Sequence, residues 1–446
     1  MLVQYLAFCV LSLVVLLCVF YDYKRTVIVW LPTQMLFNAQ IAVRYSSPAM
    51  SLVLAVDVFL LLYYFLCKQK LKKTLSVDEF FLKKPMLFII ASFVLASLFG
   101  EIQATRGFMA MIKYILAGFG MVFLAQKVLN TNEDIALFMK VSLLVSVLIV
   151  TLGLSESILQ DNLWLDFVYF NSPQDETTAG RMFYIPPSLG GGLEMRYGMV
   201  RARSFFGIHI AFGVACLMYF WLFALAYREK WKYVAKYFEI SAMLLLLAGV
   251  FLANAKTGYV GLLILLLGLY PVSKLLNLKF TLPLILAAIV LILYFPQYLD
   301  NFYSLVDSKI AEEGGGSTVH GREIQFRAAL NMFELNPLFG NGPGSIAVLK
   351  NIGNNNEILG AESSWMQILP ERGLFGAIVY IYMYIYMYKS LKKKMPKKMI
   401  QYFLLSLFVM ETATGQLDMS IWGIVMVVAY KMYSLNRDNN TRLIKL

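Results

Sequence analysis

The sequence is poor in the side chains on which soluble enzymes and metal proteins rely. Charged residues make up 15% of its 446 residues, whereas a soluble globular chain has about a quarter. The two histidines, His209 and His320, are too few and too far apart to predict a zinc site. The four cysteines lie in or beside apolar runs without metal-ligand spacing, which predicts buried, inert thiols. We therefore expect no metal and no cofactor.

Apolar sequence, in contrast, is abundant. Hydrophobic residues make up 59% of the chain, aromatic residues 15%, and the mean hydropathy is +0.67. These values favour an integral membrane protein with many interfacial Tyr and Trp residues. A span needs about 20 mostly apolar residues, and the first run shows no cleavable signal region, so it is expected to be retained. The predicted spans are 3–20, 48–67, 85–100, 108–128, 133–154, 204–227, 237–253, 257–273, 279–296, 373–389, 399–413 and 417–433.

The predicted fold is thus an all-α polytopic membrane protein with about 12–13 transmembrane helices and two long periplasmic loops, the second containing short helices. The count depends on the stretch 26–43, which Pro32 and polar residues interrupt, and which is either a broken span or an interfacial segment. The expected divisions are N-terminal helices (1–154), a first long loop (155–203), central helices (204–296), a second long loop (297–372), and C-terminal helices with a cytoplasmic tail (373–446).

The net charge of +12 does not point to nucleic acid, because the basic residues stand in short runs between apolar segments. The positive-inside rule produces such runs. Lysine or arginine clusters at 68–84, 228–236 and 389–398 fall on one side if the spans alternate, and we assign that side to the cytoplasm. The two long loops then face outward.

The second long loop contains a predicted helix in HGREIQFRAALNMFELNPLFGNGPGS. Ser317 or Thr318 can cap it, and Pro337 ends it. Arg322 recurs at helical spacing with Phe326, Ala329 and Phe333, so we expect it on the inward face, where it needs an anionic partner. Arg327 faces elsewhere and can pair with Glu323, either as an exposed ion pair or beside a ligand-binding role.

Other charged residues stand where the chain meets the membrane on the outer side. Arg201 and Arg203 directly precede a span; they either snorkel at the interface or bind a phosphate or pyrophosphate. Lys256 lies at a hairpin tip and is either interfacial or directed at the same cavity. Glu362, in GAESSWMQIL, is either a helix-start acid or a general base toward a sugar hydroxyl. His209 is expected to be a packing residue.

The loop pattern GR, followed by PLFGNGPGS and ESSWMQILPERGLFG, resembles the O-antigen polymerase and O-antigen ligase superfamily. VRARSFFGIHIAFG is similar to the arginine motif that precedes a span in that family, and NAKTGYVG to its short loop, which usually bears Ser-Arg. The resemblance covers residues from about 200 to 376. The earlier spans match in hydropathy alone.

The resemblance implies a multi-pass glycosyltransferase of the bacterial inner membrane. Its active site would face the periplasm, join glycans linked to undecaprenyl pyrophosphate, and need no metal or nucleotide sugar. A chain-length regulator protein is a candidate partner. By position, Arg322 matches the family's loop arginine, Arg201 or Arg203 matches the earlier one, and Lys256 stands where an arginine is common.

Glu362 stands where ligases typically have a histidine, which favours polymerisation over ligation to lipid A core. It could act as the base or position the acceptor. The resulting site hypothesis has Glu362 and Arg322 as catalytic residues and Arg201, Arg203, Arg322, Arg327 and Lys256 as pyrophosphate-binding residues. An O-antigen ligase and, from another class, a lipid-linked oligosaccharide flippase remain the alternatives.

Overall fold

The computed structural model describes residues 2–37, 41–44, 50–71, 75–76, 79–100, 111–172, 186–189, 195–196, 199–231, 233–270, 303, 319–346, 363–415 and 417–443. In the first half the helices are α1 (Leu2–Leu17), the π-helical η1 (Cys18–Asp22), α2 (Tyr23–Thr33), η2 (Gln34–Leu36), α3 (Leu52–Leu66), α4 (Lys68–Leu71), α5 (Lys83–Phe99), the π-helical η3 (Tyr114–Gly120), α7 (Met121–Val128), α8 (Asn132–Leu159), α9 (Leu163–Asn171) and η4 (Pro187–Leu189).

The second half contains α11 (His209–Arg228), α12 (Lys236–Leu252), α13 (Lys256–Leu269), α18 (Val319–Leu335), α20 (Ser364–Leu391), α21 (Lys397–Thr414) and α22 (Met419–Leu443). Within the described ranges, strands are confined to two short antiparallel pairs, β1 (Ala42–Arg44) with β2 (Met50–Ser51) and β3 (Met195–Arg196) with β4 (Met199–Val200). The all-α prediction is confirmed.

Helices long and apolar enough to cross a membrane number five among the described residues: Leu2–Leu36, Met111–Val128, Asn132–Leu159, His209–Arg228 and Ser364–Leu391. The shorter apolar helices are Leu52–Leu66, Lys256–Leu269 and Met419–Leu435. Every predicted span coincides with a helix except 279–296, which lies outside the described residues. The chain is a polytopic membrane protein, while the count of 12 or 13 spans stays a prediction.

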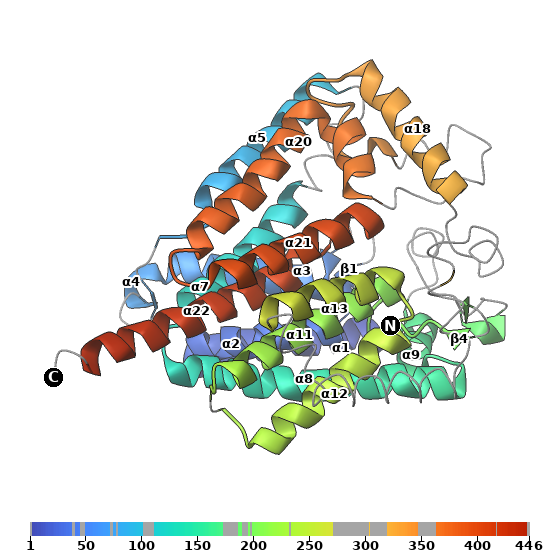
Figure 1. Cartoon of the computed structure of the whole chain (residues 1–446). Helices are drawn as coiled ribbons and strands as arrows, with labels where there is room; N and C mark the ends of the chain where they lie inside the picture. Colours follow the sequence, from blue (N-terminus) through green and yellow to red (C-terminus); the bar gives the residue numbers. More distant parts are fainter. Residues whose placement is uncertain are drawn as a thin grey trace.

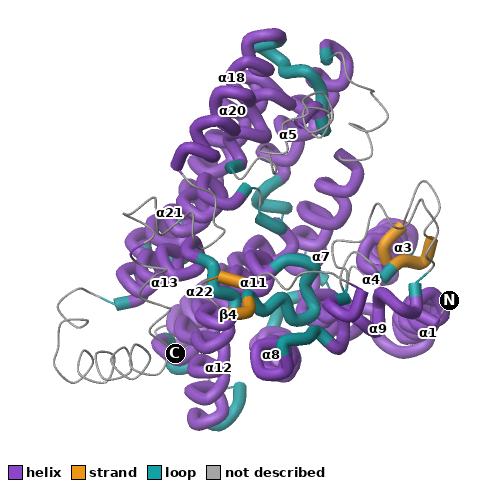
Figure 2. Tube along the Cα trace, turned by 90° about the vertical axis from the view of Figure 1, so that its right-hand side faces the viewer, coloured by secondary structure: helices purple, strands orange, loops and turns teal. Residues whose placement is uncertain are grey.

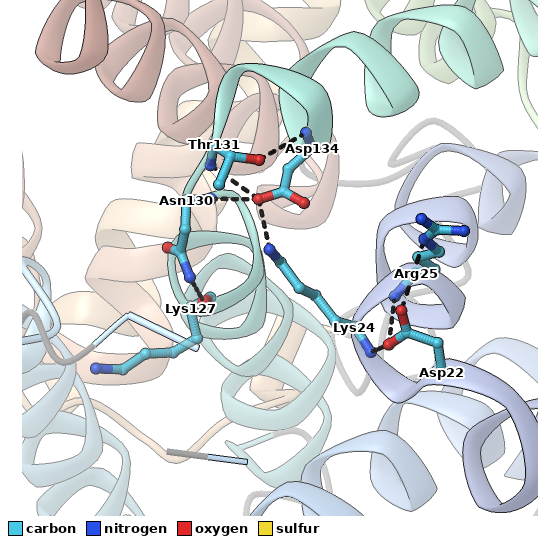
Figure 3. Close-up of polar contacts among 7 residues, drawn as sticks. All are labelled: Asp22, Lys24, Arg25, Lys127, Asn130, Thr131 and Asp134. Atoms are coloured by element: carbon cyan, nitrogen blue, oxygen red, sulfur yellow. Dashed lines mark hydrogen bonds and ion pairs between the residues drawn. The ribbon is translucent and has the colours of Figure 1, made fainter. Parts of the chain in front are cut away.

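The ambiguous stretch 26–43 lies largely in α2 and η2, which turn back along α1. Asp22 has an extended backbone (φ −151°, ψ 107°), and its carboxylate accepts hydrogen bonds from the backbone N–H groups of Lys24 (2.8 Å) and Arg25 (3.4 Å) (Figure 3). This cap ends one helical segment and starts the next. The Gln4 side chain donates to the Val43 carbonyl oxygen at 3.0 Å, so the chain returns to the level at which α1 begins.

The helices α8, α11, α12, α13, α21 and α22 pack on one another in a bundle, with α8 and α12 along its lower edge in Figure 1. Helix α11 is apolar on all sides and buried along nearly its whole length, with Trp221 and Phe223 almost fully enclosed. A helix of this composition belongs at the centre of a bundle. Helix α13 packs along α21, where the Ser406 hydroxyl donates to the Gly261 carbonyl oxygen at 3.2 Å.

A second group of helices, α5, α20 and α18, leans away from this bundle (Figures 1 and 2). Helices α5 and α20 lie side by side, and α18 packs across the first part of α20. The turn after α18 is bonded to α20 through its backbone: Leu374 N–H donates to the Pro337 carbonyl (2.8 Å), and Asn341 N–H donates to the Pro370 carbonyl (2.8 Å).

Two glycines make this docking possible. Gly340 (φ +78°) and Gly373 (φ +62°) both adopt left-handed backbone conformations, and Gly373 marks a kink inside α20. A Cβ on Gly340 would lie 2.4 Å from the Glu371 carbonyl carbon, and a Cβ on Gly373 would lie 2.5 Å from the Leu338 carbonyl carbon. Backbone approaches backbone too closely for any side chain. The PLFGNG and ERGLFG motifs therefore interlock, and this contact positions α18.

Candidate active site

Four cationic side chains gather at the end of the bundle opposite the C-terminus. The positive charges of Arg196, Arg322 and Arg201 all act on Lys256. They come from separate parts of the chain: Arg196 from β3, Arg201 from the segment after β4, Lys256 from the start of α13, and Arg322 from α18. Figure 1 shows β4, the junction of α12 with α13, and the first turn of α18 at this end. We call these four residues the cationic cluster.

The segment that carries Arg201 is held by a buried carboxylate. Glu156, near the end of α8, accepts hydrogen bonds from the backbone N–H groups of Arg203 (2.7 Å) and Ser204 (2.8 Å). Ser204 has a positive φ of 55°, and its carbonyl oxygen accepts a bond from the Asn162 side chain at 2.9 Å. Because Glu156 is almost fully buried, these two donors compensate a charge that would otherwise be costly there. The local backbone is thus held by two side chains, Glu156 from α8 and Asn162 from the start of α9.

The same segment bonds directly to the hairpin that presents Lys256. Ala202 N–H donates to the carbonyl oxygen of Leu252, the last residue of α12, at 3.0 Å. Asn254 then turns the chain with a left-handed backbone (φ 48°), a conformation that asparagine tolerates better than most residues. Lys256 follows as the first residue of α13, ahead of the apolar part of that helix.

Arg322 reaches the cluster from the outside of α18. Its Nη2 atom donates to the Ala413 carbonyl oxygen at 3.4 Å, at the end of α21. The prediction for this helix is wrong at Arg322 and Phe326, which are exposed, and right at Ala329, which is buried together with Gln325. Helix α18 packs on α20, and Gln325 and Ala329 are one helical turn apart, so the buried face is rotated away from Arg322.

The cluster changes the protonation of its lysine. Partial burial, followed by the repulsion of Arg196, Arg322 and Arg201, lowers the pKa of Lys256 to about 8. Arginine stays charged at every accessible pH, so Lys256 is the residue of the cluster that can lose its proton. A site in which several positive charges repel one another is suited to a ligand with more than one negative charge, because such a ligand offsets that repulsion.

The remaining predicted residues fall outside this group or outside the described chain. Arg203 is buried, its backbone N–H is bonded to Glu156, and its positive charge acts on that carboxylate. Arg327 pairs with Glu323 at 2.6 Å, with 74% and 50% of the two side chains exposed. His209 is buried as the first residue of α11. Glu362 lies outside the described residues, so its role stays a prediction.

Sequence reasoning missed two polar residues near the cluster. Arg196 stands in the same loop as Arg201 but without a span behind it to draw attention. Glu411 is a buried carboxylate in α21 that accepts hydrogen bonds from the hydroxyl groups of Tyr380 and, at 2.5 Å, Tyr384. It lies two residues before Ala413, which Arg322 contacts. A lone glutamate in an otherwise apolar run, with two tyrosines spaced i, i+4 on the preceding helix, was the available signal.

Chemically, the cluster combines three guanidinium groups and one ammonium group within electrostatic range of Lys256. Guanidinium groups match phosphate oxygens bidentately, whereas an ammonium group acts as a point charge. Groups of this kind stabilise negative charge that develops on a departing phosphate ester. The arrangement suits a polyanionic leaving group at the membrane surface.

Comparison with known proteins finds a family model similar to part of this region. Residues 241–381 match the family model described as O-antigen ligase. That range contains Lys256, Arg322 and both interlocking glycine motifs, while Arg196 and Arg201 precede it. No curated protein matches the chain. The chain is thus similar to the O-antigen ligase family over residues 241–381, in keeping with its resemblance to the O-antigen polymerase and ligase superfamily.

Proposed function

We propose that this protein polymerises oligosaccharide repeat units carried on undecaprenyl pyrophosphate, producing O-antigen or a related surface polysaccharide at the periplasmic face of the inner membrane. The observation that supports the proposal is the cationic cluster: backbone bonding of Ala202 to Leu252 brings the Arg201 segment to the Lys256 hairpin, and the charges of Arg196, Arg201 and Arg322 act on Lys256. Lys256 and Arg322 lie in the range that matches the O-antigen ligase model. A pyrophosphate-linked donor is the ligand whose charge fits such a cluster.

The proposed reaction is a glycosyl transfer without a metal. A hydroxyl group on the non-reducing-end sugar of one lipid-linked unit attacks the anomeric carbon of the donor glycan. The new C–O glycosidic bond forms as the bond to the pyrophosphate oxygen breaks, and undecaprenyl pyrophosphate departs. Arg196, Arg201, Arg322 and Lys256 stabilise the charge that develops on this leaving group.

Glu362 completes the proposal on the acceptor side. In this role it takes the proton of the attacking hydroxyl or orients that hydroxyl toward the donor. A carboxylate at this position, in place of the histidine typical of ligases, supports polymerisation. Arg203 and Arg327 contribute to the positive potential around the donor rather than binding it bidentately.

An O-antigen ligase is the second candidate, because the matching family model carries that description. The two activities share the donor and differ in the acceptor, which is another repeat unit for a polymerase and lipid A core for a ligase. A flippase is disfavoured, since it needs charges along a cavity at mid-membrane depth, and the cationic cluster lies at the ends of helices.

The test is complementation of a polymerase-deleted host that carries the cognate sugar-assembly genes. Wild type, Arg322→Ala and Glu362→Gln are expressed at equal membrane levels, with Lys392→Ala as a control on an exposed turn far from the cluster along α20. Lipopolysaccharide is then separated on a gel. We expect a long-chain ladder from wild type and the control, and a single repeat unit from Arg322→Ala.

Two other outcomes overturn parts of the proposal. Ladders that persist in all variants remove Arg322 and Glu362 from the site. If wild type restores attachment of glycan to core in a ligase-deleted host but makes no ladder in the polymerase-deleted one, the protein is a ligase.

A further inference from the structure

A groove with mostly apolar walls opens at the lysine-rich end of the molecule, remote from the cationic cluster. It lies between α3, α5, η3 and α7 and has a volume of about 930 Å³. Ligand pockets commonly measure about 300–1,000 Å³. The charged residues that line it are Lys68, Lys83, Lys127 and Glu79. The proposed glycosyl transfer uses none of these residues, so the groove needs an explanation of its own.

The three lysines lie at the same end of the groove. Lys68 opens the short helix α4 after α3, Lys83 is the first residue of α5, and Lys127 is in the last turn of α7. From this end the apolar lining continues to Val58 on α3 and Ile115 in η3. The ten residues from Val58 to Lys68 correspond to about 15 Å of helix, and a bilayer core is about 30 Å thick. The groove therefore has the depth of one leaflet.

Lys127 brings a positive charge into the wall of the groove. It is buried, its Nζ atom donates to the Ser76 carbonyl oxygen at 3.1 Å, and it lies 5.7 Å from the centroid of the Phe123 ring. Figure 3 shows its side chain extending away from Asp134. The Asp134 carboxylate instead contacts Lys24, at 2.7 Å.

The other charges leave the mouth of the groove positive. Glu79 lies 3.9 Å from Lys83, and 91% and 61% of these side chains are exposed. An ion pair this open to solvent contributes little. Among the described residues that line the groove, three are thus positive and one is negative, at an end that the positive-inside rule assigns to the cytoplasm.

We propose that this groove binds an anionic glycerophospholipid of the cytoplasmic leaflet, with an acyl chain along the apolar wall and the phosphate among the three lysines. Leu62 and Phe65 line the groove and remain 55% and 60% exposed, as expected for side chains that face hydrocarbon. Basic pockets between transmembrane helices on the cytoplasmic side recognise anionic headgroups in this way.

The depth of the groove selects this occupant over the polyprenyl substrate. A polyprenyl carrier long enough to need both leaflets would extend beyond the 15 Å or so of lining, whereas one acyl chain occupies a single leaflet. The location agrees, because the proposed donor site is at the other end of the helices.

The experiment measures lipid binding by the full-length protein, purified in a non-ionic detergent and freed of lipid. Phosphatidylglycerol, phosphatidylcholine and undecaprenyl phosphate are titrated separately, with native mass spectrometry counting bound lipids and intrinsic tryptophan fluorescence following thermal unfolding. The variant Lys68→Gln/Lys83→Gln is compared with Lys392→Gln/Lys397→Gln, which removes two exposed lysines from another basic turn.

We expect one phosphatidylglycerol to bind tightly and to raise the unfolding temperature, and phosphatidylcholine to do neither. Removing Lys68 and Lys83 should weaken binding about 30-fold, while the control pair stays within about twofold of wild type. Equal binding of phosphatidylcholine, tighter binding of undecaprenyl phosphate, or an equal loss in the control pair would each overturn the proposal. Because the readout is binding, failure here leaves the polymerase proposal intact.

Discussion

Two concentrations of positive charge, the cationic cluster and the groove of Lys68, Lys83 and Lys127, lie at opposite ends of the helices and are built differently. The cationic cluster combines three arginines and one lysine from segments far apart in the sequence, on backbone fixed by Glu156 and by the interlocked glycine turns. The groove between α3, α5, η3 and α7, called the lysine groove below, takes its charges from the ends of neighbouring helices. Its Lys68 and Lys83 are exposed.

This difference in construction indicates two kinds of binding: oriented recognition of one phosphate group at the cationic cluster, and general attraction of anionic headgroups at the lysine groove. Guanidinium forks held in register can bind the oxygens of one phosphate group in a defined geometry, as a reaction requires. Exposed lysines at a groove mouth attract any anionic headgroup, because an ammonium group imposes little direction. Replacing an arginine of the cationic cluster by lysine should therefore impair function. Replacing a lysine of the groove by arginine should not.

The largest effect is expected from Arg322→Lys. This change keeps the charge and removes the fork, so we expect polymer synthesis to fall about 10²–10³-fold, as when an oriented donor to a developing anion is lost. The measurement is the rate of polymer formation by purified protein with a lipid-linked donor. Lys83→Arg is the matched change in the groove and should leave that rate unaltered. Wild-type activity in Arg322→Lys would mean that charge alone suffices at the cluster.

The next effect concerns the backbone that holds Arg322 in place. Gly373→Ala should destabilise the protein by about 2–5 kcal/mol, because a left-handed backbone and a clash with the Leu338 carbonyl are combined there. Gly344→Ala is the matched control: its φ is +85°, but a Cβ there meets nothing within 4 Å, so about 1–2 kcal/mol is expected.

Thermal unfolding of both variants, together with the gel ladder, separates the cost of a left-handed backbone from the cost of the clash with the Leu338 carbonyl. If Gly344→Ala lowers the unfolding temperature as much as Gly373→Ala, the backbone contact between the two motifs is not what fixes α18. The lysine groove should retain phosphatidylglycerol binding in either variant, since α5 lines the groove through Lys83 and Met86 near its start and contacts this turn through Phe99 at its end.

Much of this architecture could be predicted from the sequence. Apolar length identified the helices, and Pro337 with its following glycines identified the end of α18. The pairing of Arg327 with Glu323 followed from their i, i+4 spacing. These features depend on residues that are neighbours in sequence, for which periodicity and turn chemistry are sufficient.

The features that were predicted wrongly or missed depend on contacts between elements that are distant in sequence. Whether Arg322 faces inward depends on the side from which α20 approaches α18, and hydrophobic spacing alone placed Arg322 and Phe326 on the buried face, where Gln325 lies instead. Arg196 joins the cluster because β3 and β4 fold back beside Lys256, a long-range contact with no local signature. The buried position of Glu411 could not be predicted without the packing of α20 on α21, which brings two tyrosine hydroxyls to its carboxylate.

A smaller, pH-dependent effect should distinguish the single lysine of the cluster from its arginines. With a pKa of about 8, Lys256 is mostly charged at pH 7 and mostly neutral at pH 9. Binding of a polyprenyl pyrophosphate should therefore weaken up to about tenfold across that range. Because the folded pKa is below the value of 10.5 for a free lysine, the ligand-free protein should gain stability as pH rises above about 8.

Lys256→Arg is the control for that measurement, since arginine remains charged and the ligand's own ionisation is common to both proteins. The variant should show a flatter affinity profile between pH 7 and pH 9 than wild type. Two superimposable profiles would show that Lys256 does not contact the ligand, and would reduce the cluster to its three arginines.

The smallest effect is expected from Arg327→Ala. Its ion pair with Glu323 is largely exposed, so its loss should cost about 0–1 kcal/mol of stability. Polymer length and rate should stay within about twofold of wild type, because a diffuse contribution to the potential is screened at physiological salt. The decisive comparison is with Arg322→Ala, five residues earlier on the same helix and measured at equal expression. If Arg327→Ala also collapses the ladder to one repeat unit, the donor lies along α18 rather than at its Arg322 end, and the cluster must be extended to include Arg327.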